Sequence, residues 1–262
     1  MAVVAMIRRR LASERGFTLI EVLMAAAVGM VVLLGASQLL DISTRASTDV
    51  TNRADAVDKG RTAMKEIVDR LRAQSCLNES TPAIVKGQRN SIDFYTVYGA
   101  TTPQPTIYGN TTASDDTVSA RRIEWVPYGG SRDDGYLQEK VWNTVDRNNA
   151  ANTFNTTPNV TRPIMDRVAP VKSGSAVTPI FRYYKFRGSD PGIPDLEVPL
   201  ASDTATLSDD DKARVVKMDV SFDARPGKNT KAARTSIDST FANEVFVRTA
   251  DARAPESSPE CL

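Results

Sequence analysis

The stretch that decides the architecture is RGFTLIEVLMAAAVGMVVLLGASQLL, residues 15–40 of a 262-residue chain. Residues 17–40 are 24 residues in which Glu21 is the only charged side chain. A helix needs roughly 20 apolar residues to cross the hydrocarbon core of a bilayer, so this segment is long enough to span a membrane. Glu21 is unusual there, because a carboxylate costs roughly 2.5–3.5 kcal/mol at the bilayer centre and generally has a functional partner.

The residues before this stretch set its orientation. Residues 1–16 carry four arginines and one glutamate, at Arg8, Arg9, Arg10, Arg15 and Glu14. Positive flanks stay in the cytoplasm, so we expect everything after Leu40 to lie outside it. A secretory signal peptide has a shorter apolar region followed by a small-x-small cleavage site, and no Ala-x-Ala lies just beyond this run. An uncleaved anchor is the simplest alternative, but it leaves Glu21 unexplained.

The order Arg-Gly-Phe-Thr-Leu-Ile-Glu, with its basic leader and long apolar run, closely resembles the class III signal sequence of type IV pilins and pseudopilins. The resemblance implies that a prepilin peptidase cuts after Gly16 and that Phe17 becomes an N-methylated N-terminus. It also implies that Glu21 pairs with the amino terminus of a neighbouring subunit. An ammonium and a carboxylate attract strongly in a low dielectric, whereas either alone is costly there. Glu21 would therefore set the register between subunits.

The helical pattern continues beyond the membrane segment. Apolar residues recur at steps of three and four along residues 41–75, at Val57, Met64, Ile67, Val68 and Leu71. Residues 41–56 are more polar, so we expect them outside any core. Gly60 is a weak point that costs about 1 kcal/mol relative to alanine. The sequence thus predicts one helix over residues 17–74, with its last four turns packed on a head domain.

Residues 76–262 read as a β-rich head. Alternating apolar and polar residues predict strands at 91–99, 121–128, 136–142, 178–188, 215–224 and 243–249. GGSRDDG, between the second and third of these, predicts a hairpin turn. Residues 100–118 and 143–162 are rich in Asn and Thr and predict long exposed loops. The fold expected is α+β and pilin-like: a leader (1–16), a transmembrane helix (17–40), an amphipathic helix (41–75) and an antiparallel sheet (76–262).

Few residues indicate chemistry. The chain has no histidine, which excludes Ser-His-Asp and Cys-His catalysis, and we expect no enzyme activity and no cofactor. Cys76 and Cys261 would form one disulfide if the head is extracytoplasmic, or remain two free thiols. Asp209 and Asp211 are weak calcium candidates, although their spacing is not that of an EF-hand and a solvated turn explains them as well.

Nucleic acid is not an expected partner. The formal net charge is +1, which provides no strong basic field. Arg121, Arg122 and Arg132 lie near Trp125 and could stack on a single strand, but an arginine beside an aromatic ring is more often ordinary packing.

Over residues 71–253 the order of head elements also resembles the W-type minor pilins and the J-type minor pseudopilins. The resemblance implies a single-pass membrane protein that later joins a surface filament. Its partners would be other pilin subunits, prepilin peptidase and the inner-membrane assembly platform. A minor type IV pilin is the function expected. The alternatives are a minor pseudopilin of a type II secretion or DNA-uptake system, and an uncleaved membrane-anchored binding protein.

Overall fold

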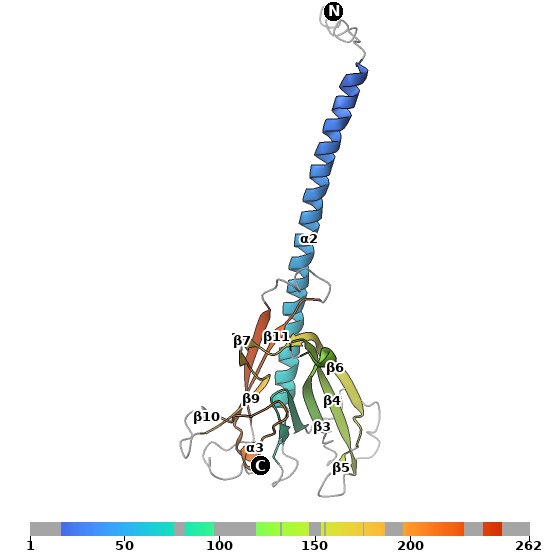
Figure 1. Cartoon of the computed structure of the whole chain (residues 1–262). Helices are drawn as coiled ribbons and strands as arrows, with labels where there is room; N and C mark the ends of the chain where they lie inside the picture. Colours follow the sequence, from blue (N-terminus) through green and yellow to red (C-terminus); the bar gives the residue numbers. More distant parts are fainter. Residues whose placement is uncertain are drawn as a thin grey trace, which may run out of the picture. The chain divides into compact units, whose positions relative to one another are not determined.

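The computed structural model describes residues 17–75, 82–96, 119–131, 133–146, 153–154, 156–174, 176–186, 196–227 and 238–247 (Figure 1). The chain divides into two compact units, residues 1–51 and residues 52–262. One helix, α2 (Leu19–Arg72), contributes to both. The predicted helix over residues 17–74 is therefore correct to within two residues at each end.

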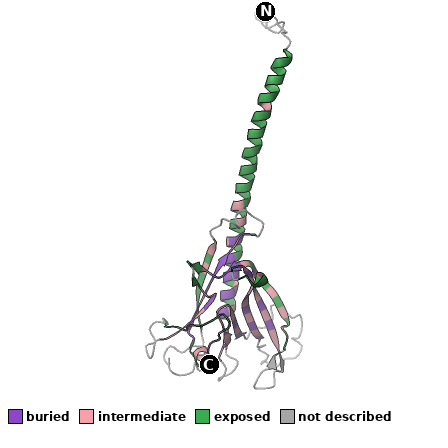
Figure 2. Cartoon of the chain, viewed as in Figure 1, coloured by how far each residue is buried: buried purple, intermediate pink, exposed green. Residues whose placement is uncertain are grey.

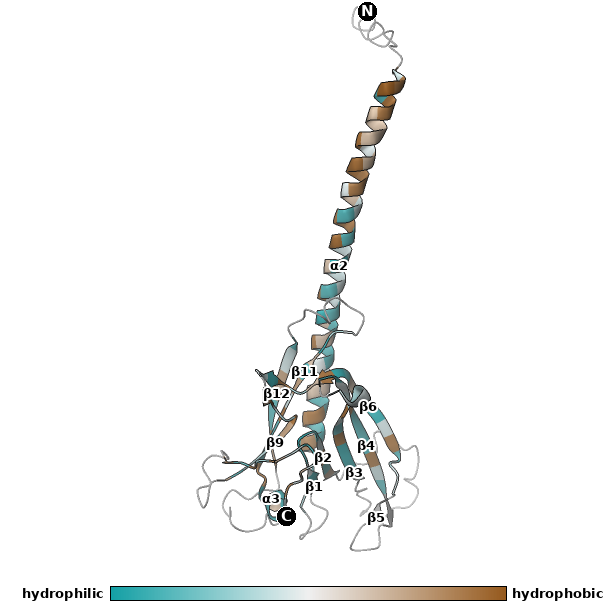
Figure 3. Cartoon of the chain, in the orientation of Figure 1, coloured by the Kyte–Doolittle hydropathy of each residue, from teal (hydrophilic) through white to brown (hydrophobic). Residues whose placement is uncertain are grey.

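In the first unit, α2 begins at a polar cap. The backbone N–H of Glu21 donates to the carbonyl oxygen of Thr18 at 3.0 Å and to its hydroxyl oxygen at 3.3 Å. Thr18 thus accepts from the third helical residue, as an N-cap residue does. No residue of the described part of this unit is buried (Figure 2). By length and composition, α2 can cross a membrane, and its apolar residues gather at its beginning (Figure 3).

The polar residues after this apolar part stabilise the helix locally. The hydroxyls of Thr44, Thr48 and Thr51 donate to the carbonyl oxygens four residues earlier, at 2.6, 2.8 and 2.9 Å. Asp41 and Arg45 form an ion pair at 2.5 Å one turn apart. These side chains satisfy their hydrogen bonds within the helix, so the segment remains helical without a core beneath it. The expectation that residues 41–56 lie outside the core is confirmed except at Ala56, which is 4% exposed.

In the second unit, residues 52–72 of α2 pack against a sheet. The buried residues of α2 recur at three- and four-residue steps: Ala56, Gly60, Ala63, Met64, Ile67, Val68 and Leu71. Four of the five predicted apolar residues are among them. The fifth, Val57, is only half-buried, because Ala56 and Gly60 take the inward positions at that turn. Small residues let the helix backbone approach the sheet there.

The sheet is antiparallel throughout, in the order β1-β2-β3-β4-β6-β11-β9-β10, with β12 also pairing β11 and β5 pairing β4. The strands of this sheet are β1 (Ile84–Gly87), β2 (Ser91–Thr96), β3 (Ser119–Pro127), β4 (Gly135–Asp146), β5 (Thr153–Phe154), β6 (Val160–Ala169), β9 (Phe181–Lys185), β10 (Leu196–Glu197), β11 (Lys217–Ala224) and β12 (Ser239–Phe246). A separate pair is β7 (Lys172–Ser173) and β8 (Ala176–Val177). Two short helices complete the described elements, η1 (Tyr128–Gly130) and α3 (Asp209–Arg214).

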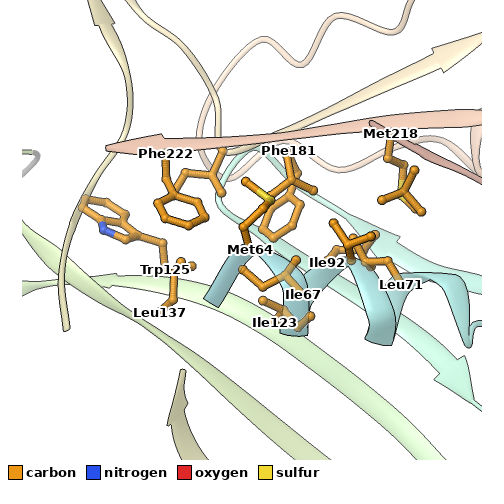
Figure 4. Close-up of a cluster of buried hydrophobic side chains, with 14 of the residues drawn as sticks. Met64, Ile67, Leu71, Ile92, Ile123, Trp125, Leu137, Phe181, Met218 and Phe222 are labelled. Carbon is orange, nitrogen blue, oxygen red and sulfur yellow. The ribbon is translucent and has the colours of Figure 1, made fainter. Parts of the chain in front are cut away.

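The core lies between α2 and one face of the sheet. Met64, Ile67 and Leu71 of the helix meet side chains from strands far apart in the sequence (Figure 4). Among the sheet residues of this core are Ile92, Ile123, Leu137, Phe181, Met218 and Phe222, each no more than 1% exposed. Burying one such side chain stabilises the fold by about 1.5–3 kcal/mol, so this layer fixes the helix on the sheet.

Most of the predicted strands are present. β2, β3, β4, β9, β11 and β12 overlap the six predicted segments, and β3 and β4 form the predicted hairpin, pairing from Ser119–Asn143 to Pro127–Gly135. The prediction of one continuous loop over residues 143–162 is wrong. β4 extends to Asp146, β5 lies within the segment, and β6 starts at Val160. Pairing with neighbouring strands outweighs the low strand propensity of Asn there, and the β-branched threonines favour strands.

β6 was not predicted because its residues do not alternate. Pro163 interrupts the strand, and the pairing with β4 shifts register at two places. Beside one of these, Arg167 has a positive φ of 59°, which is rare for a residue with a side chain. β1 is four residues long, too short for a pattern to show. The predicted loop over residues 100–118 lies outside the described residues.

Candidate functional site

The first turn of α2 holds two of the residues singled out from the sequence. Phe17 is 80% exposed and precedes the Thr18 cap. Glu21 is exposed in the first helical turn, where the helix dipole favours a negative charge. Within the part of the chain that the structure describes, no ion pair engages the Glu21 carboxylate. It is therefore available to a cation from another chain.

The helix surface after this turn is apolar on all sides. Fifteen large apolar side chains between residues 17 and 42 are at least 56% exposed: Phe17, Leu19, Ile20, Val22, Leu23, Met24, Val28, Met30, Val31, Val32, Leu33, Leu34, Leu39, Leu40 and Ile42. Apolar surface of this extent is unfavourable in water, so lipid or neighbouring helices must cover it. A carboxylate at the start of such a helix can therefore pair with a cation where water is scarce.

Residues 11–37 match the family described as the prokaryotic N-terminal methylation motif. The chain is a pilin-like protein. The match covers Arg15 and Gly16, the Phe17 position and most of the apolar segment, and it implies processing by a prepilin peptidase and assembly into a filament. Pilins are structural proteins and not enzymes. No curated protein and no solved structure matches the chain.

The remaining predicted site residues that the structure describes belong to the head of this pilin-like protein. Gly16, Cys76, Cys261 and Arg132 lie outside the described residues, so the disulfide stays a prediction. Asp209 and Asp211 lie in α3, on its first turn. Among the described residues, no group of three or more His, Cys, Asp or Glu side chains is arranged to hold a metal ion.

Asp209 and Asp211 of α3 are each paired with a lysine. The Lys185 ammonium donates to Asp211 at 2.7 Å, and this hydrogen bond lowers the pKa of the Asp211 carboxyl. The Ser208 hydroxyl also donates to Asp211 and accepts from its backbone N–H at 3.1 Å, which caps the helix. Lys212 donates to Asp209 at 2.6 Å and lowers the pKa of that carboxyl in the same way. Ion pairing and capping account for both residues.

The two described arginines beside Trp125 are not free to stack on bases. Arg122 donates two hydrogen bonds to Asp93, at 2.7 and 2.6 Å, which raise the pKa of the guanidinium, and it lies over the Trp142 ring. Arg121 is 1% exposed and faces the core. Arginine here supports the sheet.

Arg121 belongs to a buried charge cluster that the sequence analysis did not identify. Its guanidinium donates to Thr96 at 2.9 Å and to Glu139 at 2.7 Å. Glu139, which is 0% exposed, also pairs with Arg162 and Arg70.

Glu66 of α2 closes this cluster. It pairs with Arg162 of β6 and, at 3.7 Å, with Arg70 of its own helix. The cluster therefore joins α2 to β3, β4 and β6 through charged groups. The fully buried pair, Arg121–Glu139, is costly to break, and the partly exposed Glu66 and Arg70 connect it to the helix.

The sequence does hold a signal for this cluster. Arg121 is in phase with the buried Ile123 and Trp125 of β3, and Glu139 is in phase with the buried Leu137 and Val141 of β4. Opposite charges at inward positions of two strands of one hairpin indicate a buried pair. Arg121 was instead grouped with its neighbour Arg122, which points to the other face.

Proposed function

We propose that the chain is a minor type IV pilin that a prepilin peptidase cleaves between Gly16 and Phe17. The mature subunit waits in the membrane through residues 17–40 and then enters the core of a filament through the same helix. The observation that carries the proposal is the Glu21 carboxylate on the capped first turn of an exposed apolar helix, within the matched motif and with no ion pair among the described residues. A neighbouring subunit's methylated amino terminus is the cation that the proposal assigns to Glu21.

A position at or near the tip of the filament follows from the head. Residues 76–262 form a large head, and a head of this size on every subunit would crowd a long uniform shaft. We therefore place the subunit in priming or capping the filament. Its other partners are the prepilin peptidase and the assembly platform of the inner membrane.

A minor pseudopilin of a type II secretion or DNA-uptake system has the same motif and helix. Deleting the gene separates these functions: the pilus assignment predicts loss of surface pili and twitching. Loss of a secreted enzyme or of transformability would assign the other machines. An uncleaved membrane-anchored binding protein would instead retain residues 1–16 in the mature chain.

Substitution of Glu21 tests the assembly role. Glu21→Gln keeps the shape of the side chain and removes its charge, so the amino terminus of the neighbour loses its partner. We expect its incorporation into filaments to fall at least about tenfold, which corresponds to about 1.4 kcal/mol. Asp41→Asn is the matched control, because Asp41 already pairs with Arg45 of its own chain. Wild-type incorporation of Glu21→Gln would exclude the registration role.

A further inference from the structure

The last described strand of the head, β12, has an open edge. β12 pairs with β11 over its whole length, from Ser239–Ala224 to Phe246–Lys217. Among the described strands, none pairs with its other side. Alternate residues of a strand direct their N–H and C=O groups to opposite sides. The backbone N–H of Val247 donates to the carbonyl oxygen of Val216, the residue just before β11. The odd-numbered residues of β12 therefore direct their backbone N–H and C=O groups toward β11, and the even-numbered residues direct theirs outward.

The outward backbone groups are accessible. They belong to Thr240, Ala242, Glu244 and Phe246, and all four residues are exposed. Phe246 is 59% exposed, whereas the other aromatic residues of the head whose burial is described are buried or half-buried. Water therefore reaches both the backbone edge and an apolar side chain on it.

The opposite edge of the sheet is covered. The N–H of Leu207 donates to the carbonyl oxygen of Gly87 in β1 at 2.9 Å. The ammonium of Lys212 in α3 donates to the carbonyl oxygen of Val85 at 3.1 Å. A loop and a short helix thus occupy the edge groups of β1, while β12 has no such cover among the described residues.

β12 also lacks the usual protection against strand addition. Natural edge strands are guarded by lysine, proline or a short length. β12 has eight residues and contains no proline, lysine or arginine. Its one guarding contact is local: the Asn243 side-chain oxygen accepts from the backbone N–H of Glu244 at 2.8 Å. That oxygen occupies the place that a carbonyl of an incoming strand would take.

We infer that the outer edge of β12 binds an extended segment donated by a different subunit of the filament, which adds a strand to the sheet. The inference rests on the proposed function. Strand addition uses backbone hydrogen bonds for affinity and alternate side chains for specificity. Glu244 already pairs with Lys217 of β11 at 3.3 Å, so the chemistry of the added strand is set by Phe246, which favours an apolar side chain opposite it.

An antiparallel β12–β12 pairing between two copies of this chain does not fit the edge. Two copies pairing β12 with β12 in antiparallel fashion are related by a twofold axis perpendicular to the sheet. Residues 56–71 of α2 are buried along the sheet face, so this rotation would reverse the direction of the helix. Two subunits anchored in one membrane do not run in opposite directions.

Amide hydrogen exchange with single-residue resolution tests the inference. It compares the full mature chain in detergent with the same chain in assembled filaments. The amides of Ala242 and Phe246 should exchange quickly in detergent and at least tenfold more slowly in filaments. The amides of Asn243 and Val245, which face β11, should be slow in both. Equally fast exchange of Ala242 and Phe246 in both states would overturn the inference.

Two matched variants and a cross-link complete the test. Ala242→Lys places a charge on the edge and should reduce incorporation at least tenfold with an unchanged unfolding temperature. Val177→Lys, at an exposed apolar residue of β8, should incorporate as wild type. A photo-reactive residue at position 242 should cross-link to an extended segment of another subunit. A cross-link to residue 242 of a second copy would contradict the inference.

The outcomes also separate this inference from the proposed function. If the wild-type chain is absent from filaments and keeps residues 1–16, the proposed function itself fails. If the wild type is processed and incorporated, and Ala242→Lys is incorporated equally well without any edge protection, only the inference about β12 fails. If Ala242→Lys lowers the unfolding temperature, hydrogen exchange of the wild type decides alone.

Discussion

Replacing Glu139 by glutamine should destabilise the head far more than an equivalent change on the outer face of the sheet. Glu139 is 0% exposed and accepts a hydrogen bond from Arg121, which is 1% exposed. Glutamine keeps the volume but leaves the arginine charge buried without its counter-charge. Breaking a buried pair in this way costs about 3–5 kcal/mol. This is a large share of the 5–15 kcal/mol that stabilises a typical domain.

The assay is thermal unfolding of the full chain in detergent, followed by tryptophan fluorescence. A domain of this size loses about 2–4 °C per kcal/mol, so Glu139→Gln should unfold roughly 6–20 °C below the wild type. Glu124→Gln is the matched control on the neighbouring strand. Glu124 is partly exposed and pairs with Lys140 at 2.6 Å, and such a pair contributes about 1 kcal/mol or less.

A double-mutant cycle shows whether the loss comes from the pair itself. Arg121→Met and Glu139→Leu should each destabilise the head when made alone. The double variant should lose less stability than the sum of these two single changes, because it leaves neither charge buried without its partner. If the unfolding temperature of Glu139→Gln lies within 1–2 °C of that of Glu124→Gln, the charge cluster does not hold the helix on the sheet.

Two further predictions concern the head. Helix propensity alone predicts that Gly60→Ala stabilises the helix by about 1 kcal/mol. We expect it instead to destabilise the head by about 1–3 kcal/mol, because a Cβ at residue 60 would lie 2.3 Å from the ring of Phe241. Chemical denaturation measures this, and Phe241→Leu in the Gly60→Ala background should recover part of the loss. Asp211→Asn should cost about 1 kcal/mol or less near pH 7. Because Lys185 lowers the pKa of Asp211 in the folded protein, the ionised carboxylate stabilises above its unfolded pKa of about 3.9. The difference from wild type should therefore shrink as the pH falls from 5 through the lowered pKa, and a difference that persists at pH 2 would contradict the ion pair.

The helix and the hairpin could be predicted because their patterns are local. Met64, Ile67, Val68 and Leu71 share one helix face, and the β3–β4 turn is marked by residues that favour turns. Both features arise from residues close in the sequence, so no knowledge of distant contacts is required.

Features that depend on distant contacts could not be predicted. Gly60 was read as a weak point in the helix, but it lies against Phe241 of β12, which is 181 residues further along the chain. Arg162 was assigned to a loop, yet it joins α2 to β4 through Glu66 and Glu139. The contact of Gly60 and the ion pairs of Arg162 both depend on tertiary packing, which neither helix propensity nor composition indicates.

Cleavage after Gly16 and methylation of Phe17 distinguish a pilin subunit from a plain membrane anchor. Mass spectrometry of the N-terminal peptide, taken from purified membranes and from sheared filaments, tests this directly. We expect a chain that begins at Phe17 with a methylated amino group, because residues 11–37 match the methylation motif. A mature peptide that still contains Arg8 to Gly16 would contradict it and leave the chain as a plain membrane anchor with a β-rich head.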